Sequence, residues 1–176
     1  MWVFARALPS TYWLLAPRAP HATKPAGYSW RVLPPERGDG PDMDELRGAA
    51  DRLIGLVDEY CAANGIPAET FDVMGFSQGA AVTSAVALLY PARVVKAAML
   101  SGFIPRGAES LATGQPLDGK QFFVAHGTED QTVNIAYARQ TVQFLKGAGA
   151  DVTLCEDEVG HKVSAGCMRA LASFFK

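Results

Sequence analysis

Short, nearly continuous runs of apolar residues recur along the chain. They occupy residues 11–16, 71–76, 94–101, 121–126 and 151–156. Runs of this length and composition are typical of strands that helices cover on both faces. The pattern therefore predicts a sheet of about five buried strands.

Helical periodicity fills the intervals between most of these runs. In the longest interval, Leu46, Ala50, Leu53, Val57 and Tyr60 recur at steps of three and four residues. Three further helical patterns cover residues 78–89, 134–146 and 163–175. Because strands alternate with helices, we predict an α/β fold in which a parallel sheet carries helices on both faces.

The domain organisation is simple. A chain of 176 residues, 49% of them hydrophobic, is long enough for one domain with its own core, and we expect residues 1–176 to form it. Residues 18–41 are rich in Pro and Gly and are predicted to form an irregular surface segment of that domain.

Charge excludes two classes of partner. The net charge is −2, and no run of Lys or Arg could neutralise a phosphate backbone, so nucleic acid and anionic membranes are poor candidates. Small uncharged ligands suit this surface better.

The apolar N-terminal stretch is interrupted by Arg6 and Pro9 before it reaches the length of a signal peptide, and no segment approaches a membrane span. We expect a cytoplasmic protein without stable membrane insertion.

The cysteines give no sign of a framework. Cys61, Cys155 and Cys167 are odd in number and show no C-x-x-C spacing, which argues against both a disulfide scaffold and a zinc site. We expect all three to be reduced thiols in the core.

A candidate nucleophile lies where the second predicted strand meets a helix. In the sequence GFSQG, Ser77 stands between Gly75 and Gly79, as in a nucleophile elbow. Such a turn strains the serine backbone, and we expect side chains two positions away to collide with the neighbouring strand and helix. The alternative is a tight turn whose serine only caps the helix.

An acid and a base follow in the chain. Asp130 comes after the fourth predicted strand and His161 after the fifth. Together with Ser77 they occur in the order Ser, Asp, His at carboxyl ends of strands, where open parallel sheets bind their ligands. Imidazole can take the serine proton near neutral pH, and a carboxylate can orient the imidazole.

Other residues could take these roles. Glu129 adjoins Asp130, and His21 is a second candidate base, although its irregular segment suggests a surface or pocket-rim residue. His126, at a strand end, is expected to be a packed, hydrogen-bonded histidine. The acidic residues 156–158 would raise the basicity of His161 if they lay close to it.

The chain resembles α/β-hydrolases of the phospholipase/carboxylesterase family, which includes carboxylesterases and acyl-protein thioesterases. The matching stretches are LLAPRAP, the region of Trp30, NGIPAETFDVMGFSQGAAV, AAMLSGFIP, FFVAHGTEDQTV and VGHKVS. The resemblance implies a nucleophile at Ser77, an acid at Asp130, a base at His161 and an oxyanion donor in the backbone N–H of Gln78. It implies no metal and no cofactor.

The chain departs from the family pattern at two places. Gln131 and Asn134 stand where the family usually has proline. At the front, the usual early strands and the His-Gly loop with the second oxyanion donor have no counterpart, so we expect a reduced α/β-hydrolase fold. If the strand 11–16 lies beside the nucleophile strand, the backbone N–H of Ala16, Arg18 or Ala19 can replace that donor. The uncovered sheet edge predicts a homodimer.

Candidate substrate contacts lie near the strand ends. Phe103, Ile104, Trp30 and Met74 could line an acyl pocket, and core packing accounts for them equally well. The short connection between residues 101 and 121 leaves no room for a cap domain, which favours an open site and short- to medium-chain acyl esters. The sequence thus predicts a serine carboxylesterase. One alternative is a catalytically weak binding module. The other is a lysophospholipase or acyl-protein thioesterase.

Overall fold

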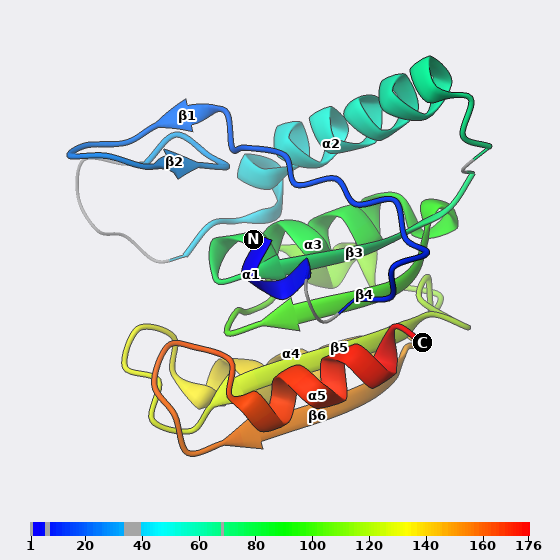
Figure 1. Ribbon diagram of the computed structural model, residues 1–176. Helices are drawn as coiled ribbons and strands as arrows, with labels where there is room; N and C mark the ends of the chain where they lie inside the picture. The colour runs from blue at the N-terminus through cyan, green and yellow to red at the C-terminus, as the bar shows by residue number, and fades with distance from the viewer. Residues whose placement is uncertain (1, 6–7, 34–39, 68) are drawn as a thin grey trace.

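A computed structural model describes residues 2–5, 8–33, 40–67 and 69–176. The expected irregular segment 18–41 lies partly outside these residues, as does Arg6. The central sheet has four parallel strands, β3 (Phe71–Phe76), β4 (Val94–Leu100), β5 (Gln121–Gly127) and β6 (Asp151–Asp157), in the spatial order β3-β4-β5-β6 (Figure 1). Each of these strands was predicted from its apolar run.

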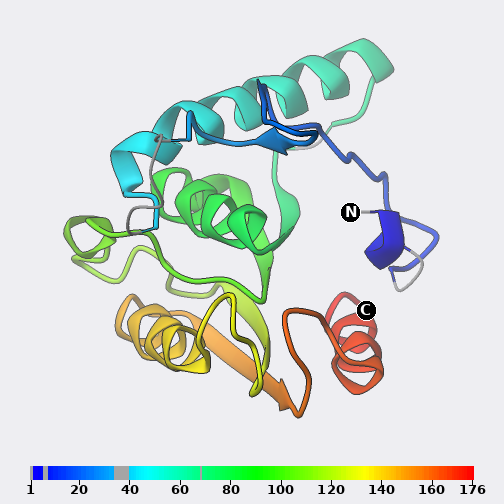
Figure 2. The same ribbon diagram turned by 90° about the vertical axis from the view of Figure 1, so that its left-hand side faces the viewer.

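Helices cover both faces of this sheet, as predicted. Helices α3 (Gln78–Leu89) and α4 (Ile135–Gly147) lie on one face, and α2 (Met43–Asn64) packs outside α3. On the other face lies α5 (Ala165–Phe174), with the short α1 (Trp2–Ala5) above it (Figure 2). Two short 3-10 turns complete the helical segments, η1 (Pro91–Arg93) and η2 (Ala108–Leu111).

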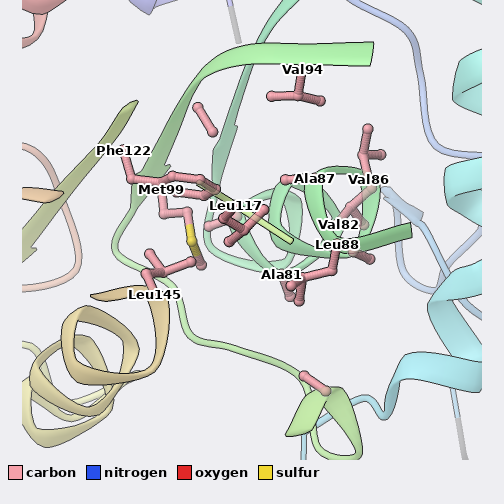
Figure 3. Close-up of a cluster of buried hydrophobic side chains, with 14 of the residues drawn as sticks. Ala81, Val82, Val86, Ala87, Leu88, Val94, Met99, Leu117, Phe122 and Leu145 are labelled. Atoms are coloured by element: carbon pink, nitrogen blue, oxygen red, sulfur yellow. The ribbon is translucent and has the colours of Figure 1, made fainter. Parts of the chain in front are cut away.

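Alternate side chains of each inner strand point into two separate cores. On β5, Phe122 and Val124 join the core with α2, α3 and α4, while Phe123 and Ala125 join the core with α5. This two-sided burial explains why the strands appear as continuous apolar runs. The larger core is centred on α3, whose small residues bring the helix close to the sheet (Figure 3).

Local signals fix the ends of α2. Asp42 accepts a hydrogen bond from the backbone N–H of Glu45, and the Glu45 side chain accepts one from the N–H of Asp42, which makes a capping box. Gly65 ends the helix with φ 63°, a conformation that costs glycine little.

The predicted first strand is absent. Residues 11–16 form a turn and irregular backbone, so the sheet has four strands instead of about five and β3 is an edge strand. The segment is attached by a side chain, because the Tyr12 hydroxyl donates to Asp72 Oδ2 at 2.8 Å and lies 3.0 Å from the carbonyl oxygen of Phe175. Burial and the adjoining Asp72 carboxylate raise the pKa of Tyr12 to about 12.

The Pro- and Gly-rich segment contains a small hairpin. Strands β1 (His21–Ala22) and β2 (Tyr28–Ser29) pair antiparallel beside α2. Among the described residues, no helix is long and apolar enough to cross a membrane.

The expectation of three reduced cysteines is wrong for two of them. Cys155 on β6 and Cys167 in the first turn of α5 form a disulfide, with their Cα atoms 5.8 Å apart, while Cys61 is free. An odd count does not exclude one pair, and this pairing arises because α5 packs across β6. The spacing of the cysteines along the chain does not indicate that α5 and β6 are in contact.

Candidate active site

Ser77 occupies a strained turn between β3 and α3. Its backbone has φ 55° and ψ −118°, and its N–H donates to the carbonyl oxygen of Leu100 at 2.8 Å. A Cβ on Gly75 would clash with the backbone of Gly79, so glycine is required there as predicted. A Cβ on Gly79 meets nothing within 4 Å, so the same expectation is wrong at Gly79.

Asp130 lies in the turn after β5, and its side chain is buried. Oδ1 accepts hydrogen bonds from the backbone N–H groups of Thr132 and Val133 at 2.8 and 2.9 Å, and Oδ2 lies 2.7 Å from His161 Nδ1. Burial raises the pKa of Asp130, but these hydrogen bonds outweigh it and hold the pKa below its ordinary value. Asp130 therefore stays ionised at neutral pH and accepts from Nδ1–H.

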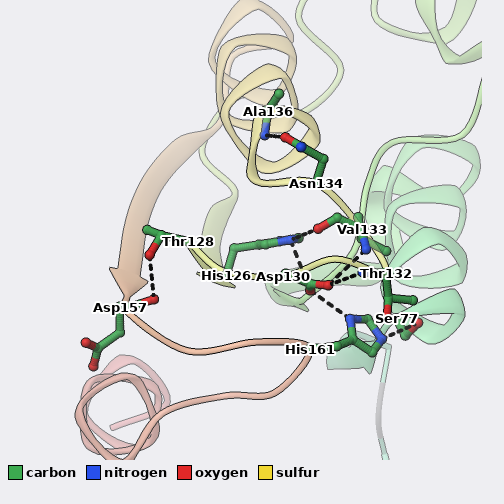
Figure 4. A network of polar contacts seen from close by, with 10 residues as sticks. All are labelled: Ser77, His126, Thr128, Asp130, Thr132, Val133, Asn134, Ala136, Asp157 and His161. Atoms are coloured by element: carbon green, nitrogen blue, oxygen red, sulfur yellow. Dashed lines mark hydrogen bonds and ion pairs between the residues drawn. The ribbon is translucent and has the colours of Figure 1, made fainter.

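His161 bridges the other two side chains. Its Nε2 lies 3.0 Å from Ser77 Oγ, while Nδ1 faces Asp130 (Figure 4). The centroid of the Phe76 ring lies 5.0 Å from that of the imidazole. With the proton on Nδ1, Nε2 is free to accept the hydroxyl proton of Ser77. The structure thus brings the three predicted residues into one hydrogen-bonded row.

The loop that carries His161 approaches β5 closely. A Cβ on Gly127 would clash with the carbonyl oxygens of Val159 and Gly160. Likewise, a Cβ on Gly102 would clash with the side chain of Ala80 beneath the Ser77 turn. Neither glycine could be identified from the sequence, because only the folded chain shows which segments meet there.

Of the alternative residues, His126 contacts this row through Asp130 but not through His161 or Ser77. It is buried, with Nε2 2.8 Å from the carbonyl oxygen of Val133 and 3.4 Å from Asp130 Oδ2 (Figure 4), and this confirms a packed, hydrogen-bonded histidine. Glu129 is exposed, and Glu156 forms an ion pair with Arg139. His21 lies in the β1–β2 hairpin and lines a smaller pocket beside α2.

A cavity of about 920 Å³ opens next to Ser77. It lies between the N-terminal segment, β3 and α2, and its lining includes Ser77, Ala16, Ala19, Trp30 and Met74. The loop that was expected to carry the second oxyanion donor therefore shares a cavity with the nucleophile, and the identity of that donor stays a prediction.

Three predicted residues lie elsewhere. Phe103 and Ile104 pack against the larger core and do not line this cavity, which favours the core-packing alternative for both. The guanidinium of Arg18 stacks over the Tyr28 ring at 4.6 Å.

The side chain of Gln78 has a role that the sequence analysis missed. Its Oε1 accepts a hydrogen bond from the backbone N–H of Trp30 at 3.0 Å, and its Nε2 donates to Ser29 Oγ at 3.0 Å. Gln78, next to Ser77, thus attaches the β1–β2 hairpin to the turn. Only its backbone N–H could be predicted from the sequence.

No metal-binding cluster accompanies the site. Among the described residues, no group of three or more His, Cys, Asp or Glu side chains could hold a metal ion.

The chain is similar to known carboxylesterases and acyl-protein thioesterases. A probable carboxylesterase from Oryza sativa subsp. japonica is 31% identical over 160 residues, 88% of this chain and 59% of the relative. Acyl-protein thioesterase 1 from Mycosarcoma maydis is 38% identical over 121 residues, which are 59% of this chain and 50% of that protein. The crystal structure of the Bacillus cereus carboxylesterase superimposes with a TM-score of 0.84 at 21% identity, covering 98% of this chain and 79% of that one.

The chain therefore spans about half to three fifths of the length of these two curated relatives. The structural match shows that it has the α/β-hydrolase fold in a reduced form, with four strands in the central sheet. Residues 18–176 match the sequence profile of phospholipases and carboxylesterases. The chain belongs to the phospholipase/carboxylesterase family.

Proposed function

We propose that the protein is a serine carboxylesterase that hydrolyses short- to medium-chain acyl esters. The observation that carries this proposal is the row of hydrogen bonds from Ser77 Oγ to His161 Nε2 at 3.0 Å and from His161 Nδ1 to Asp130 at 2.7 Å. Acyl transfer through serine requires a base that takes the serine proton and an acid that orients the base, and the row provides both.

The reaction has two halves. Ser77 Oγ attacks the ester carbonyl carbon while His161 Nε2 takes its proton, and Asp130 stabilises the resulting imidazolium. His161 then protonates the leaving alcohol, and the acyl group stays on Ser77. In the second half, His161 takes a proton from water, the hydroxide attacks the acyl-enzyme, and the acid leaves as Ser77 regains its proton.

The oxyanion formed in each half needs hydrogen-bond donors. The backbone N–H of Gln78 lies at the start of α3, where the helix dipole favours negative charge. Ala16 and Ala19 line the cavity beside Ser77, which supports their backbone N–H groups as the second donor. No metal or cofactor enters this scheme.

The test is hydrolysis of p-nitrophenyl esters from acetate to decanoate. We expect hydrolysis that falls with long chains and is lost in Ser77→Ala. A matched control is Ser173→Ala, because Ser173 is exposed near the C-terminal end of α5 and its hydroxyl donates to the carbonyl oxygen of Arg169 in the same helix. If the folded protein hydrolyses none of these esters, the binding-module alternative replaces the proposal.

The thioesterase alternative uses the same residues with another leaving group. Acyl-thioesters of the same chain lengths, measured beside the oxygen esters, separate the two substrate classes. A preference for thioesters of long chains would favour an acyl-protein thioesterase, and a preference for lysophospholipids would favour a lysophospholipase.

A cytoplasmic location stays a prediction, which cell fractionation tests.

We propose that the chain forms a homodimer through the edge of the sheet at β3. Among the described residues, this strand pairs with β4 alone, and Trp13, Leu14 and Leu15 in the segment beside it are exposed, Trp13 to 69%. Light scattering at micromolar concentration is expected to give twice the mass of one chain. A monomer would contradict the proposal.

A further inference from the structure

We propose that the disulfide between Cys155 and Cys167 positions His161, so that a dithiol that reduces this bond lowers turnover. The inference rests on the proposed role of His161 as the base. The inference is distinct from that role, because it concerns the disulfide that closes the loop carrying His161.

His161 lies at the middle of the chain segment that the disulfide closes into a loop. Cys155 and Cys167 are 12 residues apart, and His161 lies six residues from each of them (161 − 155 and 167 − 161). One end of this closed loop is a strand of the sheet and the other is the first turn of α5. Any change in the distance between strand and helix therefore acts on the loop that carries His161.

The first half of the loop is held by backbone hydrogen bonds. The Thr128 N–H donates to the carbonyl oxygen of Asp157 at 2.9 Å, and the Glu129 N–H donates to that of Val159 at 3.1 Å. These bonds fix the loop to the turn after β5 up to residue 159. They come from the same turn that presents Asp130.

The second half of the loop is held through α5. Lys162 N–H donates to the carbonyl oxygen of Gly160 within the loop, and Ser164 caps α5 by accepting from the N–H of Cys167 at 3.0 Å. The position of this half, and of His161 before it, thus follows the position of the first turn of α5. The disulfide is the covalent bond that holds this turn to the sheet.

The packing of α5 shows why one bond matters. Leu171 and Phe175 are buried at the C-terminal end of the helix, whereas Cys167 is the buried residue of its first turn, with 2% of its surface exposed. The strand beneath, β6, is an edge strand of the sheet. When the bond is cut, two thiols replace it at van der Waals separation, and the first turn of α5 can move away from the sheet.

Reduction proceeds by thiol–disulfide exchange with a dithiol such as dithiothreitol. A reductant thiolate attacks the sulfur of Cys155, which is half-buried while Cys167 is buried, and the Cys167 thiolate leaves and takes a proton. The second reductant thiol, as its thiolate, attacks its own sulfur in the mixed disulfide. This step releases Cys155 as a thiol and the reductant as a cyclic disulfide. The protein gains two electrons and two protons, and the dithiol loses them.

The expected effect is on turnover. A displacement of the base by about 1 Å can cost about 10²-fold in rate, so we expect kcat to fall by about 10- to 100-fold on reduction, with KM changed by less than about twofold. Reoxidation is expected to restore kcat. Loss of a merely structural bond would instead lower the active fraction together with the folded fraction.

The experiment measures kcat and KM for a p-nitrophenyl ester before and after dithiothreitol, with thiols counted in denaturant. The oxidised chain is expected to show one thiol, Cys61, and the reduced chain three. In Cys61→Ser the counts become zero and two, and the same fall in kcat ties the effect to the disulfide. The double variant Cys155→Ser, Cys167→Ser is expected to have low kcat that dithiothreitol does not change.

Two results would overturn the inference. One is a reduced protein with three thiols and an unchanged far-UV circular dichroism spectrum that keeps kcat within twofold. The other is loss of the circular dichroism spectrum on reduction, because the bond would then hold the fold and not the histidine.

A measurement that does not depend on ester hydrolysis separates this inference from the proposed function. The Nδ1–H of His161, bonded to Asp130 at 2.7 Å, is expected to give a low-field proton resonance that is absent in His161→Gln. We expect reduction to broaden or remove it. If the oxidised protein hydrolyses no ester, the esterase proposal fails, while this resonance still decides whether the disulfide positions His161.

Discussion

Ser77 holds a backbone conformation that L-residues rarely adopt, and its surroundings impose it. Such a conformation costs about 1–3 kcal/mol. The hydrogen bond from the Ser77 N–H to Leu100 and the contact of Gly75 with the backbone of Gly79 hold the turn in place. The strain directs the hydroxyl toward His161, which a relaxed turn with a helix-capping serine does not require, and Ser77 makes no side-chain cap hydrogen bond.

The two glycines beside Ser77 give a matched pair of variants. Gly75→Ala is expected to lower the free energy of unfolding by about 2 kcal/mol or more, because its Cβ meets backbone that cannot move freely. Gly79→Ala is expected to be neutral or to stabilise by up to about 1 kcal/mol, because it lies in a helix with open space around it. Urea unfolding of both variants checks this, and equal destabilisation would refute the steric account of the turn.

In the proposed mechanism, Asp130 selects the tautomer of His161. In Asp130→Asn, Oδ1 can keep its bonds to Thr132 and Val133, which places the amide NH₂ group against His161 Nδ1. This arrangement favours the proton on Nε2, where it prevents His161 from accepting the proton of Ser77. We expect kcat at pH 7 to fall by about 10³- to 10⁴-fold.

Steady-state kinetics tests this expectation, with the neighbouring exposed carboxylate as control. Glu129→Gln is expected to keep kcat within about twofold, since Glu129 lies outside the row of hydrogen bonds. The opposite ranking of the two variants would assign the acid to Glu129.

At the scale of elements, the site is assembled from turns at the carboxyl ends of the strands. The turns after β3, β5 and β6 supply Ser77, Asp130 and His161, and Gln78 attaches the β1–β2 hairpin above them. The row of hydrogen bonds therefore depends on the strands that precede these turns, while the Gln78 side chain joins the hairpin to the turn after β3.

We expect Gln78→Ala to loosen the hairpin. Losing the acceptor of the Trp30 N–H is expected to speed hydrogen exchange at that amide by about tenfold, the equivalent of one hydrogen bond. Gln78→Glu keeps an acceptor oxygen and is expected to exchange more slowly than Gln78→Ala. Exchange measured by mass spectrometry on the peptide containing Trp30 decides the matter. Unchanged exchange in Gln78→Ala would mean that other contacts hold the hairpin.

The elements differ in how far the sequence predicts them. The inner strands β4 and β5 are buried on both sides, so their apolar runs are visible in the chain, while the edge strands β3 and β6 are only partly buried. Ser77, Asp130 and His161 follow the ends of β3, β5 and β6. Residues 11–16 have a similar composition, but no ladder forms there and Tyr12 attaches the segment through its side chain. The disulfide and the close approach at Gly127 depend on which elements meet in space. Local patterns carry no information about either.

At the scale of the whole molecule, one side of the sheet differs from the other. At β6, helix α5 packs on one face of the sheet and the disulfide joins it to the strand, whereas β3 faces a cavity of about 920 Å³ and a segment with exposed apolar side chains. Ser77 follows β3, and His161 follows β6. This asymmetry places the proposed dimer contact and the proposed effect of reduction on opposite edges of the molecule.

The formation of an acyl-enzyme on Ser77 tests the central claim most directly. The protein is mixed with p-nitrophenyl butyrate, quenched in acid within the first turnover and digested for mass spectrometry. We predict a butyryl group on the peptide containing Ser77, and none when His161→Gln is treated in the same way. Ester hydrolysis without any acyl adduct, or an adduct on another residue, would contradict the account.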